Sequence, residues 1–356
     1  MHRRAANILF FLDKRDNAGS IQAVANYVSA GEEMGIRVAV YGEPDEKFPR
    51  IRFSRDVESF DYVVFILESR LQWLSGLRLP RILSSVPRRR RAVLDADGAF
   101  NPRVSFDGYD RNHIDERDRS RWLAYFRELA DKVMQPTLMS IEPNVLPLPF
   151  YGYDPKAQVV PEASPAKQFD IAYVGHNWWR GREVSNSLLP AFEQIYASVG
   201  PIVFIGLWWD TAPPWASQVG LEAAFYLDRE RFHRLGIQIQ PAVPFTQVIP
   251  TMSQAHVNLM TQRPVLRHFR LLTSKYFELF CADTIPLVLL DPELAEEVYG
   301  PAGRELTLDG TIEKKLLDAL DRPGKYREHV ADVRHHLVEH HSYRKRLCQL
   351  VVTLES

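Results

Sequence analysis

Residues 267–290 read RHFRLLTSKYFELFCADTIPLVLL, and the prediction of the fold starts there. A loop leads into an expected helix over Ser274–Cys281, and a tight turn follows at Asp283 and Thr284. The apolar run Ile285–Leu290 then fits a strand that is buried on both faces. A helix, a tight turn and a fully buried strand in this order are typical of an α/β domain with a parallel sheet.

The start of this helix is also a candidate ligand site. Lys275 lies in the first turn, and Glu278 lies on the same face because positions i and i+3 are neighbours on a helix. Free N–H groups and the positive end of the dipole attract anions to a helix start. Lys275 can therefore hold a diphosphate, while Glu278 accepts hydrogen bonds from a ribose diol. An ordinary amphipathic surface helix explains the same pattern equally well.

Composition limits the class of protein. A chain of 356 residues is too long for one ordinary core and is expected to form two domains. Its net charge of −1 gives no overall field that would recruit nucleic acid or anionic membrane. Two cysteines, Cys281 and Cys348, cannot form a disulfide framework, and neither a secretory peptide nor a spanning helix is recognisable. We therefore expect a cytoplasmic protein without an integral membrane segment.

The first half of the chain predicts a parallel sheet. Continuous apolar runs at Asn7–Leu12 and Asp61–Leu67 fit buried strands. A helix over Ile21–Met34 connects the first run to a strand at Arg37–Tyr41, which makes a βαβ unit. A further helix is expected over Trp122–Val133.

The turn before the first helix is a candidate acceptor site. Its residues Asn17, Gly19 and Ser20 lack the GxGxxG fingerprint of dinucleotide-binding proteins. An acceptor or the diphosphate of a donor can approach the start of the helix here. A plain tight turn is the alternative.

Two acids follow a short strand at Arg91–Leu94. Asp95 and Asp97 come at its carboxyl end, where open α/β sheets form their ligand crevice. They are candidate catalytic residues, acting as a general base or as a sugar-binding loop. A turn held by the two carboxylates is the alternative.

Basic runs and histidines elsewhere are not assigned to function. Arg88–Arg91 and Arg111–Arg121 can bind phosphates, but a solvated edge with nearby acids is the favoured interpretation. His336 and His340 are spaced for chelation, yet no HExxH signature is present. We expect no metal site.

A connector divides the chain. Residues 146–167 carry five prolines, which lack a donor and disfavour regular elements. The expected division is an acceptor domain over 1–147, a linker over 148–168 and a donor domain over 169–339. The remaining residues, 340–356, should form a helix that packs back on the first domain.

The second half repeats the strand, glycine turn and helix pattern. A strand at Phe169–Val174 is followed by Gly175 and His176, and Arg180 lies where the loop meets the next helix, within reach of phosphate oxygens. Trp209, the second of two adjacent tryptophans after a later strand, can stack on a base or sugar. Packing inside the domain is the alternative.

Four motifs occur in order across residues 165–350. They are Tyr173-Val174-Gly175 with Arg180, the G-x-x-W of Gly206–Trp209, Lys275–Leu279 with Ile285–Val288, and His341-Ser342-Tyr343 with Arg344–Arg346. In these motifs the sequence resembles spore-maturation-type, group 1-like glycosyltransferases of the GT-B fold. The resemblance implies two Rossmann-like α/β domains that face each other across a cleft.

The same resemblance implies an activity and a set of donor contacts. The activity is transfer of a sugar from a nucleotide-sugar, with a UDP-sugar as the favoured donor, to an acceptor hydroxyl. Glu278 would bind the ribose, and Lys275 with the loop Gly175–Arg180 would hold the diphosphate, next to Ser274. The loop containing Val243 and Phe245 would contact the base. The nucleotide-sugar is a co-substrate, and neither a cofactor nor a metal is implied.

One departure from the family pattern affects the stereochemistry. Arg270 stands where the first glutamate of the family's E-x7-E pair would be, and this leaves retention or inversion of configuration open. The acceptor is also left open: a glycan or a small molecule is favoured over a modified nucleic-acid base. A sugar-nucleotide epimerase of the same architecture and a binding protein without activity are the competing interpretations.

Overall fold

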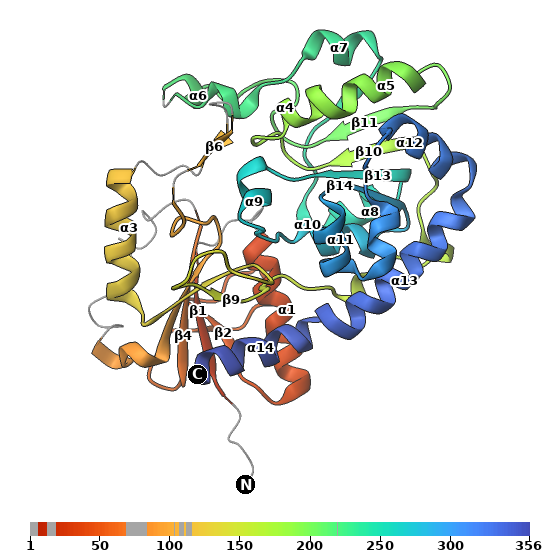
Figure 1. Cartoon of the computed structure of the whole chain (residues 1–356). Helices are drawn as coiled ribbons and strands as arrows, with labels where there is room; N and C mark the ends of the chain where they lie inside the picture. Colours follow the sequence, from red (N-terminus) through yellow and green to blue (C-terminus); the bar gives the residue numbers. More distant parts are fainter. Residues whose placement is uncertain are drawn as a thin grey trace.

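Two parallel sheets, each flanked by helices, form the two halves of the molecule (Figure 1). The structure is a computed structural model, and it describes residues 6–12, 19–68, 84–102, 104–106, 110–111, 116–218 and 220–356.

The first sheet contains seven strands in the order β3-β2-β1-β4-β5-β8-β9, and every neighbouring pair is parallel. Its central strands are buried on both faces, which explains their continuous apolar sequences. The strands are β1 (Ile8–Phe11), β2 (Val38–Tyr41), β3 (Phe53–Ser54), β4 (Tyr62–Leu67), β5 (Arg91–Asp95), β8 (Lys132–Gln135) and β9 (Leu146–Pro147).

The second sheet contains five parallel strands in the order β12-β11-β10-β13-β14. Because the chain reverses direction across the sheet between β10 and β13, a ligand crevice is expected beyond the carboxyl ends of these two strands. The strands are β10 (Phe169–Val174), β11 (Ile202–Ile205), β12 (Gln238–Gln240), β13 (Ala255–Thr261) and β14 (Ile285–Leu289).

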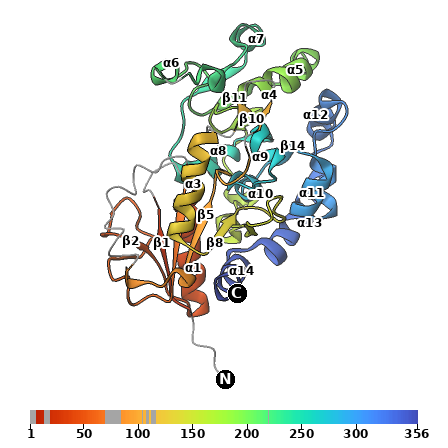
Figure 2. The ribbon, with the colours of Figure 1, turned by 60° about the vertical axis from the view of Figure 1, so that its left-hand side comes forward.

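Helices connect the strands and cover the sheets (Figures 1 and 2). The first half has α1 (Gly19–Met34) and α3 (Glu116–Leu129), with a small hairpin of β6 (Ser105–Phe106) and β7 (Asp110–Arg111). The second half has α4 (Gly181–Glu183), α5 (Leu189–Ile195), α6 (Trp215–Gln218), α7 (Arg229–Arg234), α8 (Val248–Met252), α9 (Pro264–His268), α10 (Lys275–Cys281), α11 (Pro292–Tyr299), α12 (Ile312–Asp321), α13 (Pro323–His341) and α14 (Tyr343–Glu355).

The chain crosses from one half to the other twice, and hydrogen bonds join the two crossing segments. The N–H of Tyr153 donates to the carbonyl oxygen of His341 at 2.8 Å. The buried Arg346 donates from Nε to the carbonyl oxygen of Tyr151 at 2.9 Å. Beyond this point α14 packs against α1, so the last helix lies on the first sheet's half of the molecule (Figure 2).

Two helix predictions were wrong in their extent. The helix expected over Trp122–Val133 ends at Leu129, and Lys132–Gln135 is strand β8, because a short apolar run does not distinguish a helix from a strand. The helix expected from about Glu183 to Val199 ends at Ile195 and contains a π-helical stretch, Val184–Leu188, two residues before Pro190. Proline has no N–H to continue the α-helical hydrogen bonds, which accounts for the wider turn.

No helix in the described ranges combines the length and the apolar character needed to cross a bilayer.

Candidate active site

The two halves of the molecule meet at the start of α10. A Cβ atom added at Gly19, the first residue of α1, would lie 2.9 Å from Oγ of Ser274 and 3.6 Å from the ring of Tyr151. Close by, the N–H of Leu272 donates to the carbonyl oxygen of Pro136 at 2.6 Å. The predicted acceptor residue Gly19 and the predicted donor residue Ser274 are therefore in contact. Asn17 lies outside the described residues.

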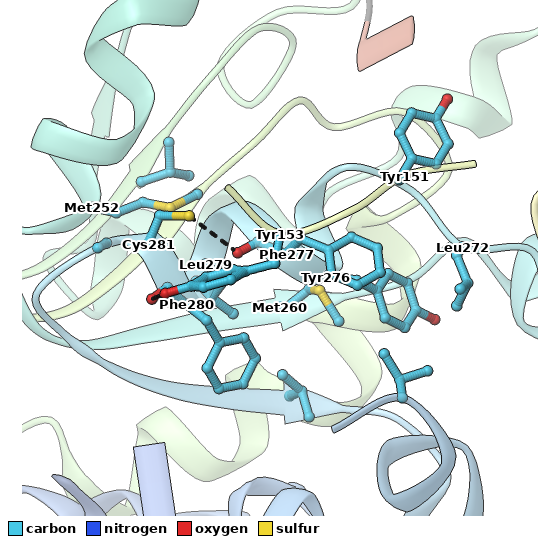
Figure 3. Close-up of a cluster of buried hydrophobic side chains, with 14 of the residues drawn as sticks. Tyr151, Tyr153, Met252, Met260, Leu272, Tyr276, Phe277, Leu279, Phe280 and Cys281 are labelled. Atoms are coloured by element: carbon cyan, nitrogen blue, oxygen red, sulfur yellow. Dashed lines mark hydrogen bonds between the residues drawn. The ribbon is translucent and has the colours of Figure 1, made fainter. Parts of the chain in front are cut away.

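Buried side chains hold α10 in place. Tyr276, Phe277, Leu279, Phe280 and Cys281 are all buried and pack around Met252 and Met260 (Figure 3). The hydroxyl of Tyr276 donates to Gln262 Oε1 at 2.6 Å, and Gln262 Nε2 donates to the carbonyl oxygen of Leu271 at 2.6 Å. This packing fixes the position of α10, and with it the positions of Lys275 and Glu278 on the other side of the helix.

The helix start differs from the sequence prediction in one respect. The N–H groups of Phe277 and Glu278 both donate to the carbonyl oxygen of Ser274, at 2.9 and 3.0 Å, and that of Tyr276 donates to Thr273. These three backbone donors are used within the turn. Attraction for an anion therefore has to come from the side chains around the helix start.

Lys275 and Glu278 form a half-buried pair. Lys275 Nζ lies 3.5 Å from Glu278 Oε2, and the two side chains are 27% and 12% exposed. Burial lowers the pKa of Lys275, and the charge of Arg180 adds to this effect. The second oxygen of Glu278, Oε1, is buried, and none of the described residues donates a hydrogen bond to it. A buried carboxylate oxygen without a donor is costly, and a ligand hydroxyl that reached it would remove this cost.

The loop after β10 reaches the same place. Arg180 donates from Nη1 to the carbonyl oxygens of His176 and Trp178 at 3.3 and 3.2 Å, which folds the loop around its guanidinium group. His176 accepts the N–H of Leu207 on Nδ1 at 3.0 Å. Burial lowers the pKa of His176 to about 4, with further contributions from the charges of Lys275 and Arg180. The imidazole is therefore neutral near pH 7, and the two cations lie close to it.

The prediction for Trp209 was wrong. Its side chain is fully buried and makes edge contacts with the rings of Tyr173 and Phe204, so it has no surface for a base or sugar. Trp209 Nε1 instead donates to the carbonyl oxygen of Gly175 at 2.7 Å. Trp209 therefore supports the Gly175–Arg180 loop from the core of the domain, and its ring is not accessible to a ligand.

Val243 and Phe245 lie at the end of β12. Both side chains are half-buried, in the segment that leads through a 3-10 turn at Phe245–Gln247 into α8. Because β12, β11 and β10 are parallel neighbours, this segment is at the same edge of the sheet as the Gly175–Arg180 loop. A role in contacting the base stays a prediction.

The two acids of the first half have different environments. Asp95 is fully buried, and its carboxylate accepts the N–H groups of Ala99 and Phe100 at 2.8 Å and Gln135 Nε2 at 2.8 Å. Burial is the main reason that the pKa of Asp95 is raised to about 6. Asp95 shapes its loop, and the prediction that it contacts substrate was wrong. Asp97 in the adjoining turn is half-buried.

Tyr151 is a site residue that the sequence did not reveal. It lies in the connector, its ring is buried beside Gly19, and burial raises its pKa well above the ordinary value. The charges of Asp97 and Glu278 act in the same direction. Tyr151 therefore lies within electrostatic range of Asp97 in the first half and of Glu278, the predicted ribose-binding residue, in the second half. Ser20, next to Gly19, is fully buried.

A separate groove of about 480 Å³ lies beside the candidate site, at the ends of β13 and β14. Arg267 and Arg270 line it together with Asp291 and Glu293, so its charges nearly balance. Arg270 has a left-handed φ of 53° and pairs with Glu297 at 2.6 Å.

Within the described ranges, no three His, Cys, Asp or Glu side chains come together as a metal-ion site. The rings of His336 and His340 lie 4.4 Å apart on α13, next to His341.

Comparison with known proteins identifies the fold. No protein-family model matches the chain, and no curated protein is significantly similar to it in sequence. An α-glucosyltransferase in complex with UDP and a 13-mer DNA containing a central A:G mismatch has a TM-score of 0.62 at 12% identity, over 99% of this chain and 100% of that one. T4 phage β-glucosyltransferase in complex with its UDP-glucose substrate has a TM-score of 0.53 at 12% identity, over 98% and 99%.

A third structure, of the T4 phage enzyme with UDP and Mn²⁺, has a TM-score of 0.54 at 13% identity, over 98% and 100%. At these identities the similarities establish the fold. The chain has the GT-B arrangement of two Rossmann-like α/β halves, as the resemblance implied. None of the comparisons supports the narrower resemblance to spore-maturation-type enzymes.

Proposed function

We propose that this protein is a glycosyltransferase that moves a sugar from a UDP-sugar to an acceptor hydroxyl. One observation carries the proposal. Lys275 Nζ lies 3.5 Å from Glu278 Oε2, the charge of Arg180 acts on Lys275, and the buried Glu278 Oε1 receives no hydrogen bond from the described residues, at a helix start that contacts Gly19 of α1. A nucleoside diphosphate presents two anionic phosphates and a ribose diol, which match these two cations and this acceptor.

The residues have separate roles in the proposed mechanism. Glu278 accepts hydrogen bonds from the ribose hydroxyls and fixes the position of the nucleotide. Lys275 and Arg180 face the diphosphate, whose negative charge grows as the bond to the sugar breaks. Because both cations are already in place and partly shielded from water, they stabilise the leaving group without reorganising.

Asp97 is the proposed general base. The charges of Asp97 and Glu278 both contribute to the raised pKa of the buried Tyr151, whose ring lies beside Gly19 of α1, and this supports placing Asp97 near the proposed donor site. A base in this place can take the proton of an acceptor hydroxyl that is held between the halves. Closure of the two halves would exclude water and limit hydrolysis of the donor.

The solved structures support the choice of donor and suggest a second acceptor. All three structures described above contain UDP or UDP-glucose, one of them also contains a 13-mer DNA, and a further similar structure is of a DNA-modifying β-glucosyltransferase. UDP-glucose is therefore the first donor to test. A hydroxylated base of nucleic acid is the second candidate acceptor, and a steep fall of acceptor affinity with salt would support it.

The proposed site balances the diphosphate with side chains and needs no metal ion. One T4 phage structure contains both UDP and Mn²⁺, so the need for a metal ion is tested separately. Turnover measured with EDTA should equal turnover measured with Mn²⁺ or Mg²⁺. A strict requirement for either ion would contradict the assignment of Lys275 and Arg180.

The experiment for the function measures release of UDP from UDP-glucose, with and without a pool of acceptors. A glycosyltransferase releases UDP faster when its acceptor is present and forms a glycosylated product. An epimerase changes the sugar without any acceptor, and a binding protein shows affinity without turnover. Either of these two results would contradict the proposal.

Three narrower assignments belong to the same proposal. The four motifs in residues 165–350 support a spore-maturation-type subgroup. The acceptor domain is taken as 1–147 and the donor domain as 169–339, with the linker 148–168 between them and the helix 340–356 after them. Free cysteines Cys281 and Cys348 fit a reducing compartment, and we propose the cytoplasm.

A further inference from the structure

An aromatic surface extends outward from the proposed diphosphate site. It is built by the described residues of 207–228, which we call the aromatic lobe, together with Trp178 of the loop after β10. The lobe includes α6, which lies at the outer edge of the molecule in both views (Figures 1 and 2). Nothing in the proposed sugar transfer uses it so far.

The rings of this surface follow one another away from the site. The ring of Trp208 lies 5.7 Å from that of His176, Trp178 lies 6.0 Å from Trp208, and Trp215 lies 6.3 Å from Trp178. Arg180 donates from Nη1 to the carbonyl oxygen of His176 at 3.3 Å, so this row begins at the proposed diphosphate site.

One buried ring holds the row together. Phe225 is 2% exposed and lies 5.1 to 5.5 Å from the rings of Trp208, Trp178 and Trp215. The tryptophans around it keep part of their surface in solvent, and Trp215 is 37% exposed, with Tyr226 nearby at 43%. Trp208 has a left-handed φ of 70°, which bulky residues rarely adopt. The lobe thus holds large aromatic faces at the surface in fixed positions.

The charge of the lobe distinguishes between possible partners. Residues 207–228 contain Asp210, Glu222 and Asp228, and no lysine or arginine. Asp210 and Glu222 are exposed, whereas Asp228 caps α7. Proteins that stack single-stranded nucleic acid on aromatic rings combine them with a positively charged groove for the phosphates. Residues 207–228 themselves have the opposite sign, and the nearby Arg182 is held over the ring of Tyr226, with its guanidinium carbon 4.9 Å from the ring centroid.

A carbohydrate fits the same surface. The carbon–hydrogen face of a sugar ring is apolar and packs on a flat indole, and its hydroxyl groups need hydrogen-bonding partners at the edges. Exposed polar side chains of the lobe can supply them, namely Asp210, Thr211, Ser217, Gln218 and Glu222. Rigid tryptophans lose little conformational entropy on binding.

We propose that the aromatic lobe binds a neutral oligosaccharide, the outer part of a carbohydrate acceptor whose reacting end lies between the two halves. The proposal rests on the proposed function and names the acceptor class for it. A nucleic acid on the lobe is the competing outcome of the test.

The test titrates the full chain with cellohexaose, maltohexaose, chitohexaose and a single-stranded 13-mer DNA, and follows tryptophan fluorescence and calorimetry. The variants are Trp215→Ala, Trp215→Phe as the conservative rescue, and Tyr196→Ala as a matched control. Tyr196 is an aromatic side chain outside the lobe and is 54% exposed. UDP is titrated separately into every variant.

We expect at least one hexasaccharide to bind with a Kd of about 1 mM or tighter. Trp215→Ala should weaken that binding about tenfold, Trp215→Phe should restore most of it, and Tyr196→Ala should have no effect. UDP affinity should be the same in all four proteins.

Three results would overturn the proposal. They are no binding of any hexasaccharide, equal binding by Trp215→Ala, or tighter binding of the DNA than of every oligosaccharide. Failure of the wild-type chain to bind UDP would instead contradict the proposed function, so the two failures are distinguishable.

Discussion

Replacing Glu278 by alanine should weaken UDP binding about 10- to 100-fold. Glu278 is 12% exposed, and its Oε1 has no donor among the described residues. Oε1 is therefore already removed from water before the ligand binds. A hydrogen bond to a charged group contributes about 1.5–3 kcal/mol, and each 1.4 kcal/mol is about tenfold in affinity. Loss of the ribose contact should therefore lower UDP affinity measurably even if Lys275 still binds the diphosphate.

The assay compares UDP with 2′-deoxy-UDP by calorimetry on the wild-type chain and on the variant. The wild-type chain should prefer UDP, and Glu278→Ala should lose most of this preference, because its partner in the hydrogen bond is gone. Glu32→Ala is the matched control. Glu32 is a half-exposed glutamate on α1 that pairs with Arg52 at 2.8 Å, and its removal should leave both affinities unchanged.

Unchanged UDP affinity in Glu278→Ala would refute the ribose assignment. An equal loss for UDP and 2′-deoxy-UDP would also refute it, because such a loss comes from distortion of α10. The melting temperature of the free protein separates these cases. Glu278→Ala also removes the partner of Lys275 Nζ, so the melting temperature should fall no further than in Lys275→Ala, whereas a distorted helix would lower it more.

Other variants test the neighbouring parts. Lys275→Ala should reduce kcat about 100-fold and donor affinity much less, since the charge on the leaving diphosphate grows in the transition state; an equal loss in both would place Lys275 in simple binding. The pKa of Asp95 is raised from 3.8 to about 6, so its contribution to folding is fully present below pH 4 and is lost as the pH rises to 6; urea unfolding of Asp95→Asn should lack this slope. Gly181→Ala should destabilise the fold by about 1–3 kcal/mol, because its Cβ would overlap the carbonyl oxygen of Tyr226, whereas Gly324→Ala has open space and serves as the control in thermal unfolding.

The sequence contained enough information for the central strands of both sheets. Strands such as β4 and β14 are continuous apolar runs between polar residues, and burial on both faces requires that pattern. The helix over Lys275–Cys281 was predicted for a related reason, since its buried residues alternate with the polar pair at helical spacing. These features depend on local sequence alone.

Local sequence did not predict which of two nearby residues of the same type is exposed at the candidate site and which is buried. Trp208 is half-exposed beside His176, and Trp209 is fully buried under Gly175. Asp95 and Asp97 differ in the same way. Where a strand ends, the direction of each side chain depends on how the following turn folds, and the residue types do not reveal it.

Contacts between distant residues were also beyond reach. Tyr151 belongs to the connector, and its ring lies against Gly19 and close to Asp97 and Glu278, which come from three other segments of the chain. The proline and glycine residues around Tyr151 predicted a linker. A linker residue is not expected to contribute to a site, so Tyr151 was not identified as a residue between the two halves. Only the packing of both halves against the connector brings these groups together.

A crystal structure of the chain with UDP tests the central claim most directly. The account predicts that the ribose hydroxyls lie within hydrogen-bonding distance of Glu278 and that the diphosphate contacts Lys275 and Arg180. A nucleotide bound in the groove beside Arg267 and Arg270, with Glu278 Oε1 left without a partner, would contradict it.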